Sequence, residues 1–568
     1  MYIKYFLLYK LLFYSVFVTF INMKSFFIEN KYICILWILC LTALLIFTGH
    51  YSNILLDVGR EVYYPQQILN GKLLYKDLFV IYGPFSYMWN ALLYKLFGTN
   101  LMTLYLSGAV CSLGIVSGIY LIAKKFLSEF MSFALGFFTI VTGVCAFHLF
   151  NFTFPYSWGM LYGTLGFIYS VFFLIKYKQT DISKYLYLSA LLAGFSVVNK
   201  YDFIIYSVFL FIIALFSKNL KIILNFITCF AIAPVISFGI LFAQGLSIDN
   251  LIETGRMLHK ITQSKTLEFF YKSQGVFFNR LVFEAWAVNF LKTASGLLGL
   301  FLSGFLMNKN RAAGYIIAVI SVIASYYLAG YKTFVFLIPL LFIFAITTYK
   351  ELKNNIPLFV LVLSSIAVSV KSFWGLTPAN YGNYYCAILL VSFFALLFTL
   401  VDKKYQKYAA IFLITVSISY LAAYSLHRSI LNSKISTKKG TIYTSKPYAD
   451  ATNELLKFLE NKENTDMVIF PEGLLINFLS KNSTPADDYY NSLIPLYSEA
   501  FTDEAFIKHF EKTKPVYIVF NNQSMKDYYF PYICQNYALQ FCGYVNENYT
   551  KVKDIYNGLN YLIFQRNH

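Results

Sequence analysis

Acidic residues that can take part in chemistry are concentrated between apolar runs, in residues 50–98. Asp57, Glu61 and Asp77 lie there, and they are three of only 13 acidic residues that precede Arg428. Carboxylates are costly beside lipid unless they have a task or a partner. A carboxylate at a membrane surface can take a proton from a hydroxyl group, and several together can hold a divalent cation. We therefore expect chemistry in this loop.

A short helix is expected to position two of these carboxylates. The segment 57–69 is predicted to be helical, with Asp57 near its N-terminus, and Asn70-Gly71 ends it as a turn. Helical spacing puts Asp57, Arg60 and Glu61 on one face. The first two residues can therefore also form an ion pair, which is the structural alternative to a catalytic role for Asp57.

Basic residues form a second group of candidates. Arg256 and Lys260 fall at helical spacing in the loop 244–283, which faces outward in the topology derived below. Because positive charge normally stays inside, an outward basic cluster suggests an anionic ligand such as a lipid phosphate. A solvated loop face is the alternative. Lys200 lies between two apolar runs and is a further candidate for contacting a phosphate. The alternative is that it is a structural partner of Asp202.

The elements that must position these residues are membrane spans. The chain of 568 residues is 58% hydrophobic and 20% aromatic. Apolar runs of about 15–23 residues recur up to residue 426, and such runs are close to the length that crosses a bilayer as a helix. We predict thirteen spans, at residues 32–49, 102–123, 131–149, 155–175, 184–198, 203–217, 222–243, 285–306, 312–331, 333–348, 356–371, 384–401 and 408–426.

The N-terminal segment 1–31 is expected on the cytoplasmic side. Residues 1–22 are also apolar, so they form either one more helix or an extension that precedes an alternative start at Met23. A cleaved signal peptide is a further reading, but no small-residue cleavage site stands out.

The net charge of +18 is compatible with nucleic-acid binding, but its distribution argues against it. From Arg428 onward there are 15 basic and 15 acidic residues, so the whole excess lies in the apolar part. There the lysines and arginines cluster in alternate short loops, which is the positive-inside pattern and marks those loops as cytoplasmic. With thirteen crossings, the loops 50–98 and 244–283 and everything after residue 427 face outward. Membrane lipids, and no nucleic acid, are the expected surroundings.

The last part of the chain is expected to be soluble. The apolar domain 32–427 is followed by a polar link, 428–447, and then by an α/β domain, 448–568. In that domain a helical pattern at 449–462 accompanies short β-rich runs, which are DMVIFP (466–471), VYIVF (516–520) and LNYLIF (559–564). Cys534 and Cys542 lie there as well, and an oxidising compartment permits a disulfide between them without requiring one. The domain carries no recognisable catalytic motif.

One ordered set of residues in the first outward loop suggests a family. The set is Asp57, Tyr63, Gly71, Tyr75, Asp77, Phe79 and Gly83-Pro84. It resembles the first external loop of GT-C type membrane glycosyltransferases that use polyprenyl-phosphate sugars. These include the dolichyl-phosphate-mannose protein mannosyltransferases and the lipid A aminoarabinose transferases. The layout of thirteen helices and an outward C-terminal domain is also similar.

This chain departs from the family pattern at one position. The family often has a second acidic residue directly after the first, where this chain has Val58. Either Glu61 substitutes for it or Asp57 acts alone.

The resemblance implies an inverting transfer of a hexose or pentose from a polyprenyl-phosphate donor. The acceptor would be a glycan, a lipid or a protein at the outer face of the cytoplasmic (inner) membrane. Asp57 is then the candidate base. Glu61 and Asp77 are further acidic candidates, each with a structural alternative. No cofactor is required, although the three carboxylates offer an alternative site for a divalent cation. The candidates for the donor phosphate are Arg256, Lys260, Lys200 and Arg60.

Two other functions remain open at this point. If the chain is a transporter or flippase for a lipid-linked glycan, we expect charged residues along a pathway within the spans and two related halves. No internal repeat is visible in the sequence. A polymerase or ligase of the O-antigen type also handles polyprenyl-linked sugars. Such proteins usually concentrate their key residues in a late outward loop, whereas the acidic cluster here follows the first span.

Overall fold

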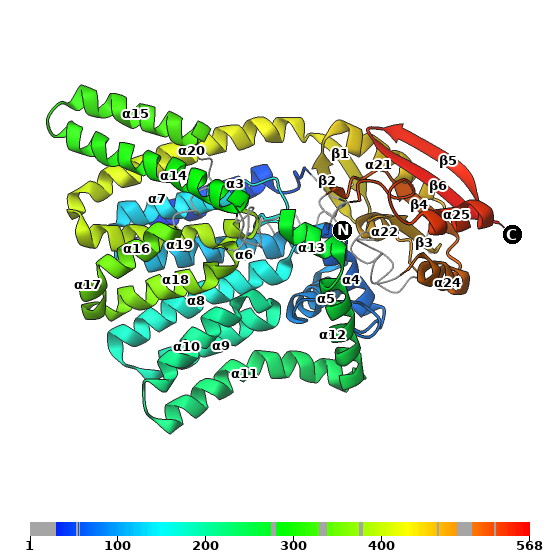
Figure 1. Ribbon diagram of the computed structural model, residues 1–568, viewed down its shortest axis with the longest axis horizontal. Coiled ribbons are helices and arrows are strands. Elements are labelled where there is room, and N and C mark those ends of the chain that lie inside the picture. The colour runs from blue at the N-terminus through cyan, green and yellow to red at the C-terminus, as the bar shows by residue number, and fades with distance from the viewer. Residues whose placement is uncertain are drawn as a thin grey trace.

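The computed structural model describes most of the chain. The described residues are 30–52, 55, 57–273, 280–328, 338–373, 379–462, 465–484, 502–526 and 530–567. Figure 1 shows a bundle of long helices with a smaller domain, which contains the main β-sheet, at one end. Residues 1–22, whose state the sequence left open, lie outside the described residues.

Each of the thirteen predicted spans coincides with a helix, in whole or in part. The helices are α3 (Lys31–Phe47), α6 (Leu101–Ala123), α7 (Glu129–Thr139), which continues as a π-helical turn (Ile140–Val144), α8 (Trp158–Thr180), α9 (Ser183–Asn199), α10 (Ile204–Leu215), α11 (Leu220–Ala243), α14 (Arg280–Met307), α15 (Arg311–Leu328), α16 (Ile338–Thr347), α18 (Ile356–Phe373), α19 (Ala379–Leu400) and α20 (Gln406–Ile430).

Several of these helices have the length and composition of membrane-spanning helices, which indicates an integral membrane protein. Four described helices are long and apolar enough to cross a membrane. These four are Leu101–Ala123, Trp158–Thr180, Leu220–Ala243 and Lys403–Ile430. The number of thirteen crossings, and the side that each loop faces, remain predictions.

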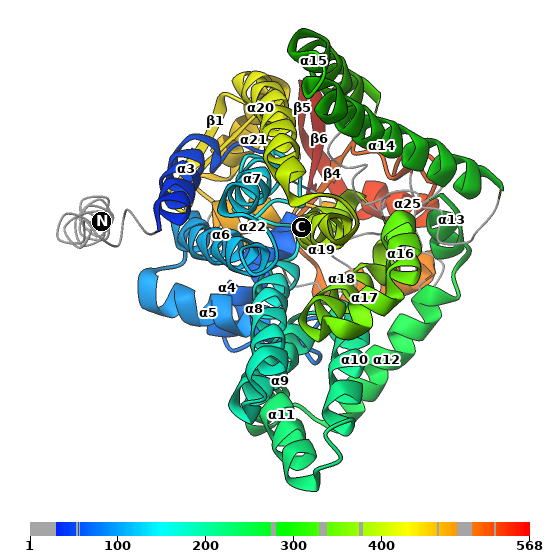
Figure 2. The same cartoon turned by 90° about the vertical axis from the view of Figure 1, so that its left-hand side faces the viewer.

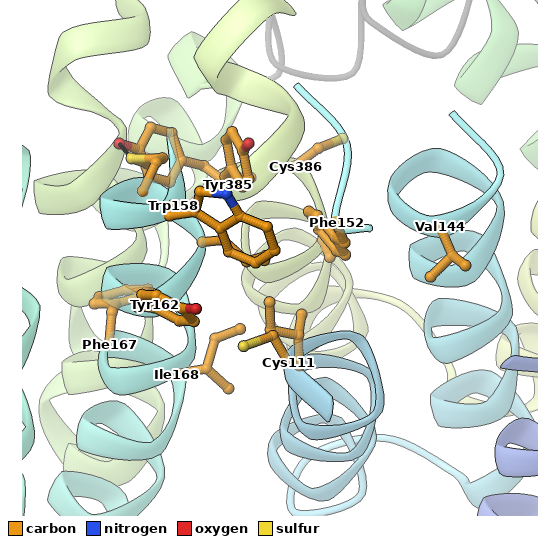
Figure 3. Close-up of a cluster of buried hydrophobic side chains, with 14 of the residues drawn as sticks. Cys111, Val144, Phe152, Trp158, Tyr162, Phe167, Ile168, Tyr385 and Cys386 are labelled. Carbon is orange, nitrogen blue, oxygen red and sulfur yellow. Dashed lines mark hydrogen bonds between the residues drawn. The ribbon is translucent and has the colours of Figure 1, made fainter. Parts of the chain in front are cut away.

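The centre of the bundle is filled by aromatic side chains. Trp158, in the first turn of α8, is fully buried, and so are Phe152 and Tyr385, which come from the loop before α8 and from α19. Figure 3 shows these side chains beside Cys111 of α6. In lipid, close packing rather than the hydrophobic effect holds helices together. Figure 2 shows α19 in the middle of the bundle and α11 and α15 at its edge. Because Trp158 is packed in this core, the start of α8 is fixed in position.

Shorter helices lie where the bundle meets the C-terminal domain (Figure 1). The predicted helix at 57–69 is confirmed as α4 (Val58–Leu69), and Asn70 is its C-terminal cap. Beside α4 lies α5 (Phe85–Phe97). The loop 244–283 contains α12 (Ile248–Thr262) and α13 (Lys265–Ser273). Another short helix, α17 (Tyr349–Asn354), lies instead at the opposite end of the bundle from the C-terminal domain (Figure 1).

The C-terminal domain is the predicted α/β unit. Its sheet has the order β3-β4-β6-β5, in which β3 and β4 are parallel and the other pairs are antiparallel. All three predicted β-rich runs are strands. The elements are α21 (Lys446–Leu459), β3 (Met467–Phe470), α22 (Leu474–Ser480), α24 (Asp503–Thr513), β4 (Tyr517–Asn521), α25 (Leu539–Asn548), β5 (Tyr549–Asn557) and β6 (Leu559–Arg566).

The polar link at 428–447 forms an ordered contact with the bundle. It contains a hairpin of β1 (Ser433–Thr437) and β2 (Gly440–Thr444). The backbone N–H of Tyr443 donates to the carbonyl of Gly49 at 2.7 Å, and that of Leu101 donates to the carbonyl of Lys439 at 2.8 Å. These bonds fasten the hairpin to the ends of α3 and α6. Within the C-terminal domain, Cys534 and Cys542 form the disulfide that the sequence left open.

Candidate functional site

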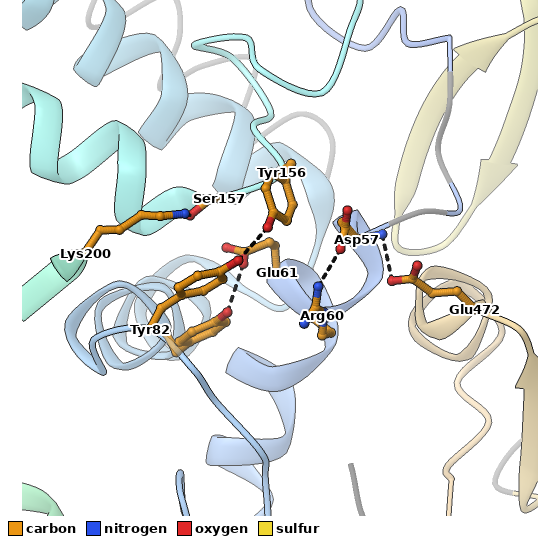
Figure 4. Close-up of polar contacts among 9 residues, drawn as sticks. Asp57, Arg60, Glu61, Tyr82, Tyr156, Ser157, Lys200 and Glu472 are labelled. Atoms are coloured by element: carbon orange, nitrogen blue, oxygen red, sulfur yellow. Dashed lines mark hydrogen bonds and ion pairs between the residues drawn. The ribbon is translucent and has the colours of Figure 1, made fainter. Parts of the chain in front are cut away.

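Charged and aromatic side chains from five separate segments meet between the helix bundle and the C-terminal domain. We call this group the junction cluster, and Figure 4 shows how its members face one another. They come from α4, from the segment before α5, from the segment before α8, from the end of α9 and from the segment between β3 and α22. The members are Asp57, Arg60, Glu61, Tyr82, Tyr156, Ser157, Lys200 and Glu472.

Asp57 immediately precedes α4 and has an unusual backbone. Its φ is +61° and its ψ is −38°, and its side chain does not cap the helix. Instead Oδ1 accepts from a terminal nitrogen of Arg60 at 2.5 Å, so the predicted ion pair is present. The side chain of Asp57 is 26% exposed, whereas Glu61 is 3% exposed and Glu472 is fully buried. Of these three carboxylates, only Asp57 offers appreciable surface to an incoming molecule.

Arg60 is a nearly buried cation between two carboxyl groups. Its side chain is 10% exposed, and Nε has no hydrogen-bond partner among the residues that the structure describes. Burial by itself would lower the pKa of Arg60, but the adjacent Asp57 and Glu472 raise it well above its ordinary value. The guanidinium therefore stays charged, with one N–H group unpaired in the described part of the chain.

Glu61 has both carboxylate oxygens engaged. Oε1 accepts from the hydroxyl of Tyr87 at 2.9 Å, and Oε2 accepts from the backbone N–H of Trp158 at 3.0 Å. Burial raises the pKa of Glu61 to about 7, although these two hydrogen bonds favour the ionised form. Because Trp158 begins α8, this carboxyl group ties α4 to the aromatic core of the bundle.

Lys200 is a second buried cation. It follows α9 and is 1% exposed. Its Nζ donates to Oγ of Ser157 at 3.3 Å and lies 4.0 Å from the ring centre of Tyr82. The hydroxyl groups of Tyr82 and Tyr156 are 2.5 Å apart. Ser157 is also the N-terminal cap of α8, since its Oγ accepts from the N–H of Met160, so the cation is held where α8 begins.

Two glycines allow the segments around Lys200 to approach closely. A Cβ atom on Gly83 would lie 1.9 Å from the carbonyl oxygen of Val198, and one on Gly159 would lie 2.5 Å from that of Asn199. No side chain fits at such distances. The end of α9 is therefore clamped between the segment before α5 and the first turn of α8.

The other predicted site residues make contacts of their own. Oδ2 of Asp77 accepts from the backbone N–H of Leu73 at 2.8 Å and closes its own loop. Arg256 pairs with Glu253 at 3.6 Å, and both side chains are well exposed, as is Lys260. Within the described ranges, no hydrogen bond or ion pair joins Asp77, Arg256 or Lys260 to the junction cluster. The structure thus brings together Asp57, Arg60, Glu61 and Lys200.

Glu472 was not among the residues predicted from the sequence. It is fully buried, and Oε1 accepts from the backbone N–H of Asp57 at 2.7 Å. Its Oε2 has no hydrogen-bond partner in the described part of the chain. Burial, and then the charge of Asp57, raise the pKa of Glu472 to about 8. The available signal was a glutamate between Pro471 and Gly473, directly after an apolar strand, because a carboxylate at a strand end often marks a site.

A metal site does not emerge from the described side chains. Among them, no group of three His, Cys, Asp or Glu residues is placed to hold a metal ion. The divalent cation that the three predicted carboxylates suggested remains a prediction.

No protein-family model and no curated protein matches the sequence. Among solved structures, the chain is similar to ArnT from Cupriavidus metallidurans bound to undecaprenyl phosphate, at 12% identity over 95% of this chain and 98% of that chain, with a TM-score of 0.46. The same protein in the apo state gives 12% identity, 94% and 98% coverage and a TM-score of 0.47. The chain is also similar to the archaeal oligosaccharyltransferase AglB from Archaeoglobus fulgidus, in complex with an inhibitory peptide and a dolichol-phosphate. The identity there is 12% over 88% of this chain and 70% of that chain, and the TM-score is 0.42.

Proposed function

We propose that this chain is an integral-membrane glycosyltransferase. It transfers a hexose or pentose from a polyprenyl-phosphate donor to a glycan, lipid or protein acceptor on the extracytoplasmic face of the cytoplasmic membrane. The observation that carries the proposal is the composition of the junction cluster. One partly exposed carboxylate pairs with a nearly buried arginine, and a buried lysine belongs to the same cluster, at the end of an apolar helix bundle. This combination suits a reaction between a lipid phosphate and a hydroxyl group.

Asp57 is the base in this proposal. The acceptor oxygen attacks the anomeric carbon of the sugar, and the hydroxyl proton passes to the carboxylate of Asp57. The bond between the anomeric carbon and the phosphate oxygen breaks, and its electron pair leaves with the polyprenyl phosphate. Attack from the opposite face inverts the anomeric centre. A well-placed base of this kind contributes about 10²–10⁴-fold to a rate. Glu61 supports the site instead, because both of its oxygens are engaged.

Arg60 and Lys200 bind the donor phosphate. Arginine matches the geometry of phosphate oxygens and lysine supplies a point charge. Both cations are largely shielded from water, so their effect on the charge that develops on the leaving phosphate is stronger than at an exposed site. Arg256 and Lys260, on the exposed side of α12, are suited to attracting anionic headgroups toward the junction cluster. Asp77 shapes the loop between α4 and α5.

The proposal is tested by comparing glycans and lipid-linked sugars in cells with and without the protein. Loss of one sugar residue from a glycan, with build-up of the matching polyprenyl-phosphate sugar, supports the transferase. Build-up of a complete lipid-linked oligosaccharide on the cytoplasmic side would instead identify a transporter. An unchanged set of glycans and lipid-linked sugars would contradict the proposal.

A further inference from the structure

Within the part of the C-terminal domain that the structure describes, Glu472 is the side chain that belongs to the junction cluster. Glu472 follows β3 and contacts Asp57, which belongs to the first loop after α3. We infer that Glu472 is a positioning residue of the proposed active site: by accepting the backbone N–H of Asp57, it holds that residue in a conformation with positive φ and leaves its carboxylate free for Arg60 and the substrate. The inference rests on the proposed role of Asp57 and adds the C-terminal domain to the site.

The backbone conformation of Asp57 needs to be stabilised by contacts from another part of the chain. A φ of +61° is uncommon for a residue with a side chain, and a ψ of −38° lies outside the left-handed region that aspartate tolerates. Such a conformation persists only where neighbouring contacts impose it. The Asp57 N–H donates to Oε1 of Glu472 at 2.7 Å, a short distance within the normal range for an N–H···O hydrogen bond.

This hold also determines what the Asp57 side chain does. A residue in this position usually caps the helix with its own side-chain oxygen. Here the side chain makes no such bond, and Oδ1 faces Arg60 instead. The carboxylate is thereby directed to the cation of the junction cluster rather than to the end of α4.

Glu472 is itself held firmly, as a positioning residue must be. The side-chain amide of Asn521, at the end of β4, donates to the backbone carbonyl of Glu472 at 3.0 Å. In the first turn of α4, a Cβ atom on Gly59 would lie 2.6 Å from the backbone nitrogen of Leu475 in α22. The two backbones therefore touch beside the Asp57–Glu472 contact. Movement of the C-terminal domain would be transmitted to Asp57.

Hydrogen–deuterium exchange of the Asp57 amide tests its hydrogen bond to Glu472 without any substrate. The full-length protein in detergent is compared with the variants E472A and E472Q, and with E504A as a matched control in an exposed position of α24. We expect exchange in a peptide covering residues 55–62 to be faster on the order of tenfold in E472A. In E472Q, whose amide oxygen still accepts, and in E504A, the rate should stay within about threefold of the wild-type rate. Unchanged exchange in E472A would overturn the inference.

Kinetics separate positioning from a purely structural role. In E472A, kcat per folded molecule should fall about tenfold or more while the KM for the polyprenyl-phosphate sugar stays the same, and E472Q should recover most of kcat. If E472A does not fold, E472D replaces it, because its side chain is one methylene too short to reach the amide. An unchanged kcat per folded molecule would overturn the inference. Faster exchange in E472A, together with full activity of D57N, would keep the hold on the backbone but refute the role of Asp57 as the base.

Discussion

The guanidinium of Arg60 lies 2.5 Å from Oδ1 of Asp57, and the two side chains are only 10% and 26% exposed. A second Arg–carboxylate pair with the same spacing along a helix, Arg256 with Glu253, is 72% and 58% exposed. The two pairs therefore form a natural comparison, because one is shielded from water at the proposed site and the other lies on an open helix face.

We predict that R60M destabilises the protein much more than R256M does. Removing Arg60 leaves the largely shielded carboxylate of Asp57 without its partner cation, which costs about 3 kcal/mol. An exposed pair contributes about 0–1 kcal/mol. The measurement is the unfolding midpoint of the full-length protein in detergent, and equal midpoints for the two variants would contradict the electrostatic role of Arg60.

Lys200 is expected to contribute more to phosphate binding than Lys260. K200M removes a buried cation from Tyr82 and Ser157, whereas K260M removes an exposed one. The affinity for undecaprenyl phosphate should fall on the order of tenfold in K200M and by less than about threefold in K260M, because a shielded charge interacts more strongly. Binding of undecaprenol, which lacks the phosphate, serves as the control and should not change in either variant. Equal losses in K200M and K260M would favour the exposed loop as the phosphate site.

Gly59 is predicted to be essential for docking of the C-terminal domain. In G59A the new methyl group would meet the backbone of α22, at 2.6 Å from the nitrogen of Leu475, so the two helices must move apart. We expect a loss of about 1–3 kcal/mol in stability. The matched variant G543A adds the same group to α25, where nothing lies within 4 Å, and should be neutral or stabilising by up to about 1 kcal/mol. Similar unfolding midpoints for G59A and wild type would show that the contact is not tight.

Stability should fall as the pH rises through the pKa of Glu61. In the folded chain this pKa is about 7, above its ordinary value of 4.5, because the carboxyl group is buried. The folded chain therefore binds the proton more tightly than the unfolded chain between these values, and this contribution, about 3 kcal/mol, is present below pH 4.5 and lost above pH 7. The unfolding midpoint between pH 4 and 9 measures it. E61Q should reduce this dependence, with the part due to Glu472 remaining, and E504Q should not change it. An identical dependence in E61Q and wild type would refute the assignment.

Local patterns in the sequence predicted much of the site. The helix 57–69 and the Asp57–Arg60 pair follow from helical spacing, and Lys200 stood out because a charge between apolar runs is rare. The contact that completes the cluster could not be predicted in this way. Asp57 and Glu472 are 415 positions apart, and they meet only because α22 docks against α4. No period or spacing in the sequence encodes such a contact, and the burial of Lys200 depends equally on the close approach of distant backbones.

Sugar transfer by the D57N variant tests the central claim most directly. Membranes containing the full-length protein are supplied with undecaprenyl-phosphate hexoses and pentoses that carry a labelled sugar, and transfer of the label to endogenous acceptor is measured. D57N should insert normally and lose about a hundredfold or more of the rate. D249N, with its change on the exposed side of α12, should stay within about twofold of wild type. Transfer by D57N at the wild-type rate would contradict the account.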